Sequence, residues 1–318
     1  MCMKKFLQYS ATYIIIVTTV FVSIELTLLL FLNTYSYKRD YLEKHINEIE
    51  ILLLGNSYVE EGVRPDIIGN NCFNIAISGR DIVFDSEISK KYFKMMKKLK
   101  VVVMPLDYSK FEFGRGMQNP KDTRKNIDAM ADTYRCMHYK YMNLHVGGFW
   151  YWSELLNSQL NYMSRYWQSR NESVECDSLG YIKLELAKRS NDWENRALPP
   201  IVDTSLDIDE DLFEYYYQNF MTIVESCKDV GARFLIISTP KSNSYRKEMN
   251  KVVQVEIAKF IEKLQVECPE SHIQYIDFSY DDSFEANDFN DACHLSDCGA
   301  VKFSEKLRSC LVDSLLTY

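Results

Sequence analysis

The sequence has 318 residues, of which 47% are hydrophobic and 26% are charged, and this composition excludes a disordered or low-complexity protein. The formal net charge is −8, and lysine and arginine are scattered along the chain, so no nucleic-acid partner is expected. Nine cysteines occur without a C-x-x-C pair, which argues against a zinc knuckle or a thioredoxin-like motif. We expect neither a metal nor an organic cofactor.

The first predicted element is a transmembrane helix at about residues 10–32. No charged residue occurs from Phe6 to Ile24, and apolar residues resume after Glu25, so the segment is long enough to cross a bilayer. No small-x-small cleavage site follows it. We expect a cytoplasmic tail at residues 1–9, an uncleaved signal anchor, and a catalytic domain that is periplasmic or on the cell surface. The irregular cysteine set is more typical of a reducing compartment and stands against this localisation.

A charged, helical stalk is predicted at residues 33–48, followed by one globular domain at residues 49–318. Within this domain, short continuous apolar runs are typical of strands buried on both faces of a parallel sheet. The predicted strands are residues 50–54, 73–77, 100–106, 233–239 and 273–277.

Helical patterns separate these strands. They cover residues 84–98, 209–231, 244–266 and 299–316. Alternating strands and helices predict an α/β fold, a doubly wound parallel sheet of about five strands, with active groups beyond the carboxyl ends of the strands. Residues 115–205 lack a strand pattern, and we expect a mostly helical insertion there that covers part of the active edge.

A serine stands where the first predicted strand gives way to a turn, in "GNSY" at residues 55–58. Because a serine hydroxyl alone is a poor nucleophile, Ser57 would need a histidine to accept its proton and a third group to orient the imidazole. His294 lies in "NDACHLSDCGA", residues 290–300, three residues after Asp291. That spacing allows the Asp291 carboxylate to accept a hydrogen bond from one ring nitrogen and leaves the other to face Ser57.

Several alternatives stay open at this stage. Ser57 could instead be a helix amino-terminal cap, which is a common role for serine. The thiol of Cys293 is expected to point away from His294. The orienting carboxylate could also belong to one of three neighbouring residues, Asp282, Asp288 and Asp297.

Three stretches of the chain resemble blocks of the SGNH (GDSL-like) hydrolase family: "GNS" at 55–57, "FNIAISGRDI" at 73–82 and "DACHLSDCGA" at 291–300. The resemblance implies a flavodoxin-like sandwich in which Ser57, His294 and Asp291 are catalytic. It also implies that the Gly79 amide contributes to the oxyanion site. Asn56 stands where the family more often has Asp, and it either contacts the substrate or donates to its own turn.

The third block departs from the family pattern. The family has G-x-N-D after the third strand, with the Asn side chain donating to the oxyanion, whereas this chain reads "VMPLDYS" at 103–109. Asp107 stands at or near the Asn position, and an ionised carboxylate cannot donate. One missing oxyanion donor typically lowers the rate by about 100- to 1000-fold. Asp107 would instead hold a neighbouring Arg or Lys, or a sugar hydroxyl.

The membrane helix, "GNS", "LDYSKF" and the "HLS" ending resemble a membrane-anchored branch of this family, which includes alginate O-acetyltransferase-like and D-alanyl-lipoteichoic acid transfer proteins. The resemblance implies a serine esterase or O-acyltransferase acting on acyl, chiefly acetyl, esters of extracytoplasmic glycans. A catalytically weak glycan-binding or scaffold protein is the alternative. Glu25, inside the predicted membrane helix, either contacts a membrane-bound acyltransferase partner or reaches water at the interface.

Overall fold

A computed structural model describes the chain in five stretches, residues 3–29, 34–80, 82–106, 174–198 and 210–316. Asp107 and most of the expected insertion at 115–205 lie outside them. The chain divides into two compact units, one formed by residues 1–37 and 123–175 and the other by residues 38–122 and 176–318. The second unit contains the sheet and every described site residue.

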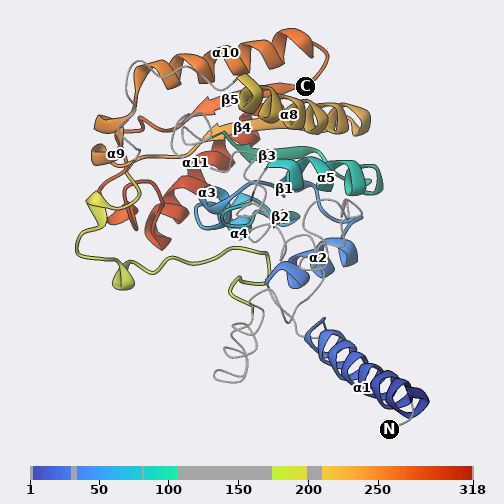
Figure 1. Ribbon diagram of the computed structural model, residues 1–318. Helices are drawn as coiled ribbons and strands as arrows, with labels where there is room; N and C mark the ends of the chain where they lie inside the picture. The colour runs from blue at the N-terminus through green and yellow to red at the C-terminus, as the bar shows by residue number, and fades with distance from the viewer. Residues whose placement is uncertain (1–2, 30–33, 81, 107–173, 199–209, 317–318) are drawn as a thin grey trace. The chain divides into compact units, whose positions relative to one another are not determined.

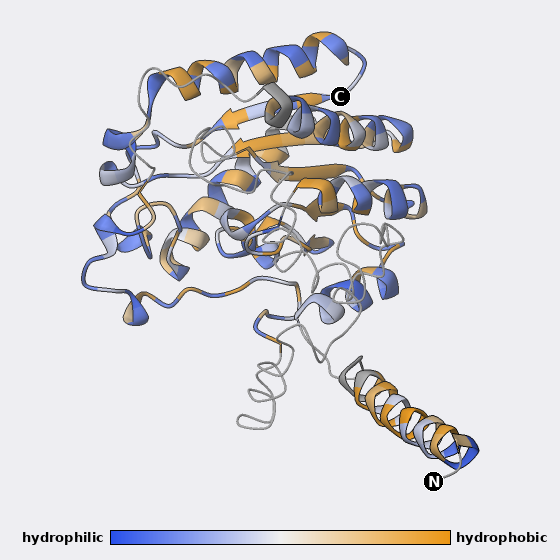
Figure 2. Ribbon diagram, in the orientation of Figure 1, coloured by the Kyte–Doolittle hydropathy of each residue, from blue (hydrophilic) through white to orange (hydrophobic). Residues whose placement is uncertain are grey.

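The first unit contains α1, Met3–Leu29, an apolar helix at the amino terminus (Figure 2). Its stretch Met3–Ile24 has a mean hydropathy of 1.6 and no buried residue, and it is the one helix in the described stretches that is long and apolar enough to cross a membrane. A bilayer requires about 20 apolar residues. By length and composition, α1 can therefore act as a membrane anchor or as a signal sequence.

The second unit is built around a parallel sheet of five strands in the order β2-β1-β3-β4-β5 (Figure 1). Short, almost entirely buried apolar runs form four of these strands, as expected for a sheet covered on both faces. The predicted fold class is thereby confirmed. The strands are β1 (Ile51–Leu53), β2 (Cys72–Asn74), β3 (Val101–Pro105), β4 (Arg233–Ser238) and β5 (Ile273–Asp277).

The strand order reverses at β1, because the chain passes from β1 to β2 on one side and then to β3 on the other. In open α/β sheets, ligand sites form beyond the carboxyl ends of the strands at such a switch point. Ser57 follows β1 directly and therefore lies at this position.

Helices cover both faces of the sheet. On one face, Phe303 and Leu307 of α11 belong to the same buried cluster as Leu53 and Val103 of the strands. On the other face, Phe220 of α8 contacts Phe234 of β4. The helices of this unit are α3 (Ser57–Glu60), α4 (Pro65–Ile68), α5 (Ile82–Tyr92), α8 (Glu210–Val230), α9 (Asn243–Glu248), α10 (Lys251–Glu267) and α11 (Asp297–Leu316). Short 3-10 turns are η1 (Phe93–Met95), η4 (Leu186–Lys188), η5 (Trp193–Asn195) and η6 (Ala286–Asp288).

One predicted helix, residues 244–266, is in fact two helices. The backbone of Met249 is extended, with φ −67° and ψ 129°, and it ends α9. The Asn250 side chain then accepts a hydrogen bond from the Val252 amide at 2.8 Å and begins α10. Asn is a favoured amino-terminal cap, so a new helix starts where the apolar pattern alone continues.

Helix α2, Thr34–Lys44, covers much of the segment expected as a stalk. The α/β unit begins at Lys38, and both Lys38 and Leu42 have 0% exposure. Further along, Ile46 and Ile49 are also buried. Part of the expected stalk thus contributes side chains to the interior of the α/β unit.

Candidate active site

The Ser57 turn, residues 55–61, begins at a glycine that no other residue could replace without rearrangement. Gly55 has φ +113°, and a Cβ there would lie 2.3 Å from Cδ of Pro105 at the end of β3. The Asn56 side chain then accepts from the Tyr58 amide at 3.2 Å and caps α3. Asn56, rather than Ser57, is the cap, so the Ser57 hydroxyl is left for other contacts.

The Ser57 hydroxyl meets a histidine that is 237 residues away in sequence. Ser57 Oγ lies 2.9 Å from Nε2 of His294. On the other side of the ring, Nδ1 lies 3.0 Å and 2.9 Å from the two carboxylate oxygens of Asp291. The structure therefore brings Ser57, His294 and Asp291 into the linear order that a nucleophile, a general base and an orienting carboxylate require.

The other three acidic residues near His294 bond elsewhere. Asp282 pairs with Arg246 at 2.7 Å. Asp288 pairs with Lys302 at 2.8 Å, and Asp297 accepts from the Leu186 amide at 3.3 Å. Among the four candidates considered from sequence, Asp291 is the residue whose carboxylate contacts the imidazole.

The His294 turn, residues 290–294, is closed by local bonds. Phe289 and Leu295 form an antiparallel bridge, and the Asn290 amide donates to the His294 carbonyl at 2.9 Å. Further on, a Cβ at Gly299 would lie 1.9 Å from the Asp288 carbonyl oxygen. A glycine is therefore needed where α11 passes this turn.

Burial and hydrogen bonding shift the pKa values of His294 and Asp291 in opposite directions. Burial alone would lower the pKa of His294, but the hydrogen bond with Asp291 and the contact with Cys293 outweigh it and raise this pKa above the ordinary value. Burial alone would raise the pKa of Asp291, but bonds from the imidazole and from two backbone amides lower it. These contacts thus favour an imidazolium beside an ionised carboxylate, the pair that would form if His294 accepted a proton.

Cys293 lies closer to His294 than the sequence suggested. Its thiol is buried, and its Sγ is 3.4 Å from Nδ1 of His294 and accepts from the Tyr58 hydroxyl at 3.3 Å. The expectation that it points away from His294 is therefore wrong, because the turn directs both side chains inward. The donor atoms of Asp291, Cys293 and His294 lie within 4.8 Å of one another, close enough to share a metal ion. Such an ion would compete with the bond between Asp291 and the imidazole.

Two further side chains that sequence reasoning did not single out lie at this site: Tyr58 packs against the imidazole, and Lys241 packs against Tyr58. The ring of Tyr58 stacks on that of His294, with centroids 4.9 Å apart and an angle of 15° between the rings. Behind it, the buried Nζ of Lys241 lies 3.4 Å from the Tyr58 centroid and donates to the Thr239 hydroxyl at 3.0 Å. The position of Tyr58, directly after the serine, was the available signal. Nothing in the sequence pattern marks Lys241.

The Gly79 loop, residues 77–80, lies beside the Ser57 turn, since the Ile77 amide donates to the Gly55 carbonyl at 3.0 Å. Gly79 has φ +72° and is exposed. Within the described stretches, neither the Ser57 amide nor the Gly79 amide donates to a protein acceptor. Two such amides are available to a developing oxyanion.

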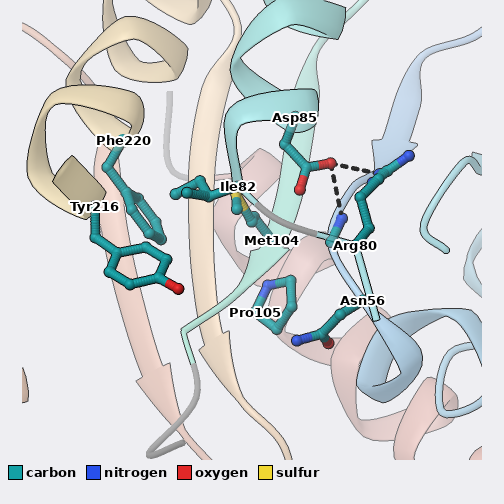
Figure 3. A pocket seen from close by; sticks show the side chains of 9 residues that line it. Asn56, Arg80, Ile82, Asp85, Met104, Pro105, Tyr216 and Phe220 are labelled. Atoms are coloured by element: carbon teal, nitrogen blue, oxygen red, sulfur yellow. Dashed lines mark hydrogen bonds and ion pairs between the residues drawn. The ribbon is translucent and has the colours of Figure 1, made fainter. Parts of the chain in front are cut away.

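A small cavity of about 20 Å³ lies next to the Ser57 turn (Figure 3). Asn56 lines its polar end together with Arg80 and Asp85, which form a buried ion pair. Asp85 also accepts from the Gly55 amide at 3.2 Å. The other walls of the cavity are largely apolar and come from β3, α5 and α8: Ile82, Met104, Pro105, Tyr216 and Phe220. The volume corresponds to about one water-sized group.

Comparison with known proteins places no family name on the chain. No family model and no curated protein matches it. Among solved structures, a protein from Streptococcus pneumonia, provisionally described as a platelet activating factor, is 11% identical with a TM-score of 0.43, over 95% of this chain and 99% of that one. A GDSL-like lipase from Bacteroides thetaiotaomicron is 11% identical with a TM-score of 0.40, over 88% and 99%. At this identity and TM-score, neither similarity assigns an activity to this chain.

Proposed function

We propose that this chain is an SGNH-type serine esterase or O-acyltransferase. The observation that carries the proposal is the continuous chain of contacts from Ser57 Oγ through both nitrogens of His294 to Asp291. It lies at the switch point of a parallel sheet, where the described residues also offer two unused backbone amides. Ester chemistry requires a nucleophile, a base, an orienting group and oxyanion donors together, and this site holds candidates for all four.

In the proposed reaction, Ser57 Oγ attacks the ester carbonyl carbon while His294 Nε2 accepts the hydroxyl proton. The carbonyl oxygen becomes an oxyanion that the Ser57 and Gly79 amides bind. The intermediate collapses to an acyl-serine, and His294 gives its proton to the leaving alcohol. Water or a sugar hydroxyl then attacks the acyl-serine, His294 accepts the proton of that group, and the proton finally returns to Ser57 Oγ.

A short acyl group on an extracytoplasmic glycan is the substrate class that we propose. The small cavity beside Asn56 favours a short group, and the apolar helix α1 suits a protein held at a membrane with its α/β unit outside the cytoplasm. Asp107 and the part of the insertion that lies outside the described residues belong to this proposal as contacts for the sugar. Asn56 is already bonded to its own turn, so its proposed role is to shape the site.

The test is acyl transfer by the full chain in detergent. An aryl acetate labelled in its acetyl group is supplied with and without an oligosaccharide acceptor, and acetate and acetylated sugar are quantified. A serine-reactive phosphonate followed by peptide mass spectrometry identifies the modified residue. We expect label on Ser57 and turnover that Ser57→Ala abolishes, while Ser309→Ala, an exposed serine of α11, retains it. Turnover unchanged in Ser57→Ala would contradict the proposal, whereas absence of turnover by the wild type would favour a scaffold role.

A further inference from the structure

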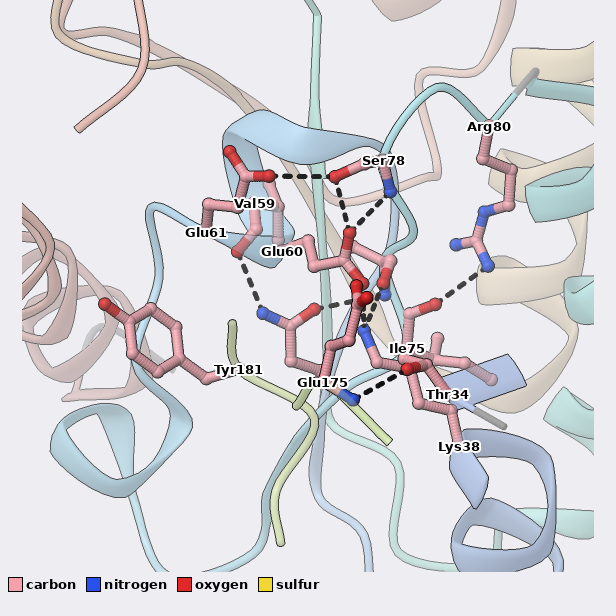
Figure 4. Close-up of polar contacts among 12 residues, drawn as sticks. Thr34, Lys38, Val59, Glu60, Glu61, Ile75, Ser78, Arg80, Glu175 and Tyr181 are labelled. Atoms are coloured by element: carbon pink, nitrogen blue, oxygen red, sulfur yellow. Dashed lines mark hydrogen bonds and ion pairs between the residues drawn. The ribbon is translucent and has the colours of Figure 1, made fainter. Parts of the chain in front are cut away.

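A buried lysine from α2 reaches the catalytic edge of the α/β unit (Figure 4). Lys38 is fully buried, and its Nζ lies 2.7 Å from Oε1 of Glu60, whose side chain is 2% exposed. The same ammonium donates to the Ala76 carbonyl at 2.5 Å. Taking two charges out of water is costly and often adds little stability. We therefore ask which neighbouring groups the Lys38–Glu60 pair holds in position, rather than how much it stabilises the fold.

The second oxygen of Glu60 holds the Gly79 loop. Oε2 accepts from the Ser78 amide at 2.5 Å, and the Ser78 hydroxyl lies 2.6 Å from the same oxygen. That hydroxyl is also 3.0 Å from Oε1 of Glu61, and its one proton can go to either carboxylate. Lys38 thus contacts the Ala76 carbonyl directly before the loop, and Glu60 contacts the Ser78 amide within it.

Among the described residues, three of the four amides in the Gly79 loop donate to protein acceptors, and the Gly79 amide does not. The Ile77 amide is taken by Gly55, the Ser78 amide by Glu60, and the Arg80 amide donates back to Ile77 at 3.1 Å. Gly79, between the last two, has the left-handed φ of +72° and no acceptor within the described stretches. Because its neighbours are bonded on both sides, the direction of the Gly79 amide depends on the Glu60 carboxylate.

Glu60 is also on the same short helix as the nucleophile, since α3 runs from Ser57 to Glu60. We propose that Lys38 and Glu60 are positioning residues, which together hold the Ser78 amide and so set the direction of the Gly79 amide relative to Ser57. This inference rests on the proposed function. It also gives the part of α2 that begins at Lys38 a role in the α/β unit.

The experiment compares Glu60→Gln, Lys38→Met and the double variant K38M/E60Q with the wild-type full chain in detergent. Lys44→Met removes a lysine from an exposed position on the same helix and is the matched control. The readouts are kcat and KM for an aryl acetate, together with hydrogen exchange of the peptide containing residues 75–80. The double variant removes both buried charges, so it is the test if either single variant fails to fold.

We expect kcat to fall about 100-fold with KM changed by less than about 2-fold, because a misplaced donor lowers transition-state stabilisation rather than substrate binding. Exchange of the loop amides should accelerate about 10-fold, and Lys44→Met should match the wild type in both readouts. Wild-type kcat with unchanged loop exchange in the folded variants would overturn the inference.

If the proposed function is wrong, turnover and hydrogen exchange give different answers. In that case Ser57→Ala retains turnover, whereas the exchange measurement still reports whether Glu60 holds the loop. Fast loop exchange in Glu60→Gln then supports the positioning role independently of the chemistry, and unchanged exchange overturns it.

Discussion

The Ser57 turn and the His294 turn bring their side chains to within 2.9 Å of each other, but they are held by different kinds of contact. The Ser57 turn depends on residues elsewhere in the chain. Asp85 accepts from the Gly55 amide, and Lys38 pairs with Glu60 at the end of the turn. Both of these distant side chains are buried and charged.

In the His294 turn the carboxylate of Asp291 supplies local bonds, while the Ala292 backbone bonds outside the turn to Arg196 and Ser242, each at 3.1 Å. One oxygen of Asp291 accepts from the Cys293 amide at 2.9 Å and from the His294 amide at 2.8 Å, in addition to contacting the imidazole. The same carboxylate therefore shapes the turn and orients the ring. We therefore expect the position of Ser57 to depend on remote buried charges, and that of the His294 ring to depend chiefly on Asp291.

The largest expected effect comes from removing either side chain at the point where the two turns meet. Ser57→Ala and His294→Ala should each lower kcat for an aryl acetate by about 10⁴-fold or more, and the double variant should lose little beyond that, because the two groups act as a unit. His272→Ala, an exposed histidine, is the matched control. Losses that multiply in the double variant would show that the two turns act separately.

Asp291→Asn tests the local character of the His294 turn. We expect a loss on the order of 10³- to 10⁴-fold in kcat, since an amide favours the wrong imidazole tautomer. Asp282→Asn, an exposed neighbour paired with Arg246, should have wild-type activity. If Asp291→Asn retains most of the rate, the carboxylate does not orient the base.

The pH dependence of kcat/KM tests whether Asp291 raises the pKa of His294. The imidazole must be neutral to accept the Ser57 proton, so activity should rise with pH through the pKa of His294 in the free enzyme. Because Asp291 helps raise that pKa, the rise should lie above pH 6.5, the ordinary value for histidine. In Asp291→Asn the rise should move to lower pH. A rise that stays in place would indicate that another group sets this pKa.

Asp85→Asn tests the dependence of the Ser57 turn on remote charges. The variant leaves Arg80 buried without its carboxylate and weakens the acceptor of the Gly55 amide, so the free energy of unfolding should fall by about 3 kcal/mol. In the folded fraction, kcat should fall about 10- to 100-fold as Ser57 shifts. Asp229→Asn, in an exposed pair with Lys94, controls for the loss of a charge. Denaturant unfolding with rate measurement separates the two effects.

The smallest effect is expected for Cys293→Ala. The thiol contacts His294 and Tyr58, but the turn is held by Asp291, so kcat should stay within about 3-fold of the wild type, with about 1 kcal/mol lost in stability. Cys298→Ala, an exposed cysteine, is the control. A loss above about 10-fold would mean that the thiol helps to hold the imidazole.

Much of the fold follows from local pattern. Four strands were predicted to within one residue at each end, and β2 was predicted to end three residues too late, at 77 instead of Asn74. Buried parallel strands are continuous apolar runs that the sequence displays directly. The division of residues 244–266 into two helices was missed, because the apolar periodicity persists through the break and Asn250 carries the one local signal. The burial of Lys38 in α2 was also missed, since a lysine in a charged segment normally faces water.

The α/β class, the apolar amino-terminal helix and the candidate pair "GNS" and "DACH" could be predicted without the structure, because strand burial, helix length and turn residues are local properties. The tertiary structure alone decided which acidic residue meets His294, where the Cys293 thiol points and what Glu60 holds. Those contacts depend on how each turn folds, which spacing along the chain does not encode, and the contact between Ser57 and His294 joins residues 237 positions apart.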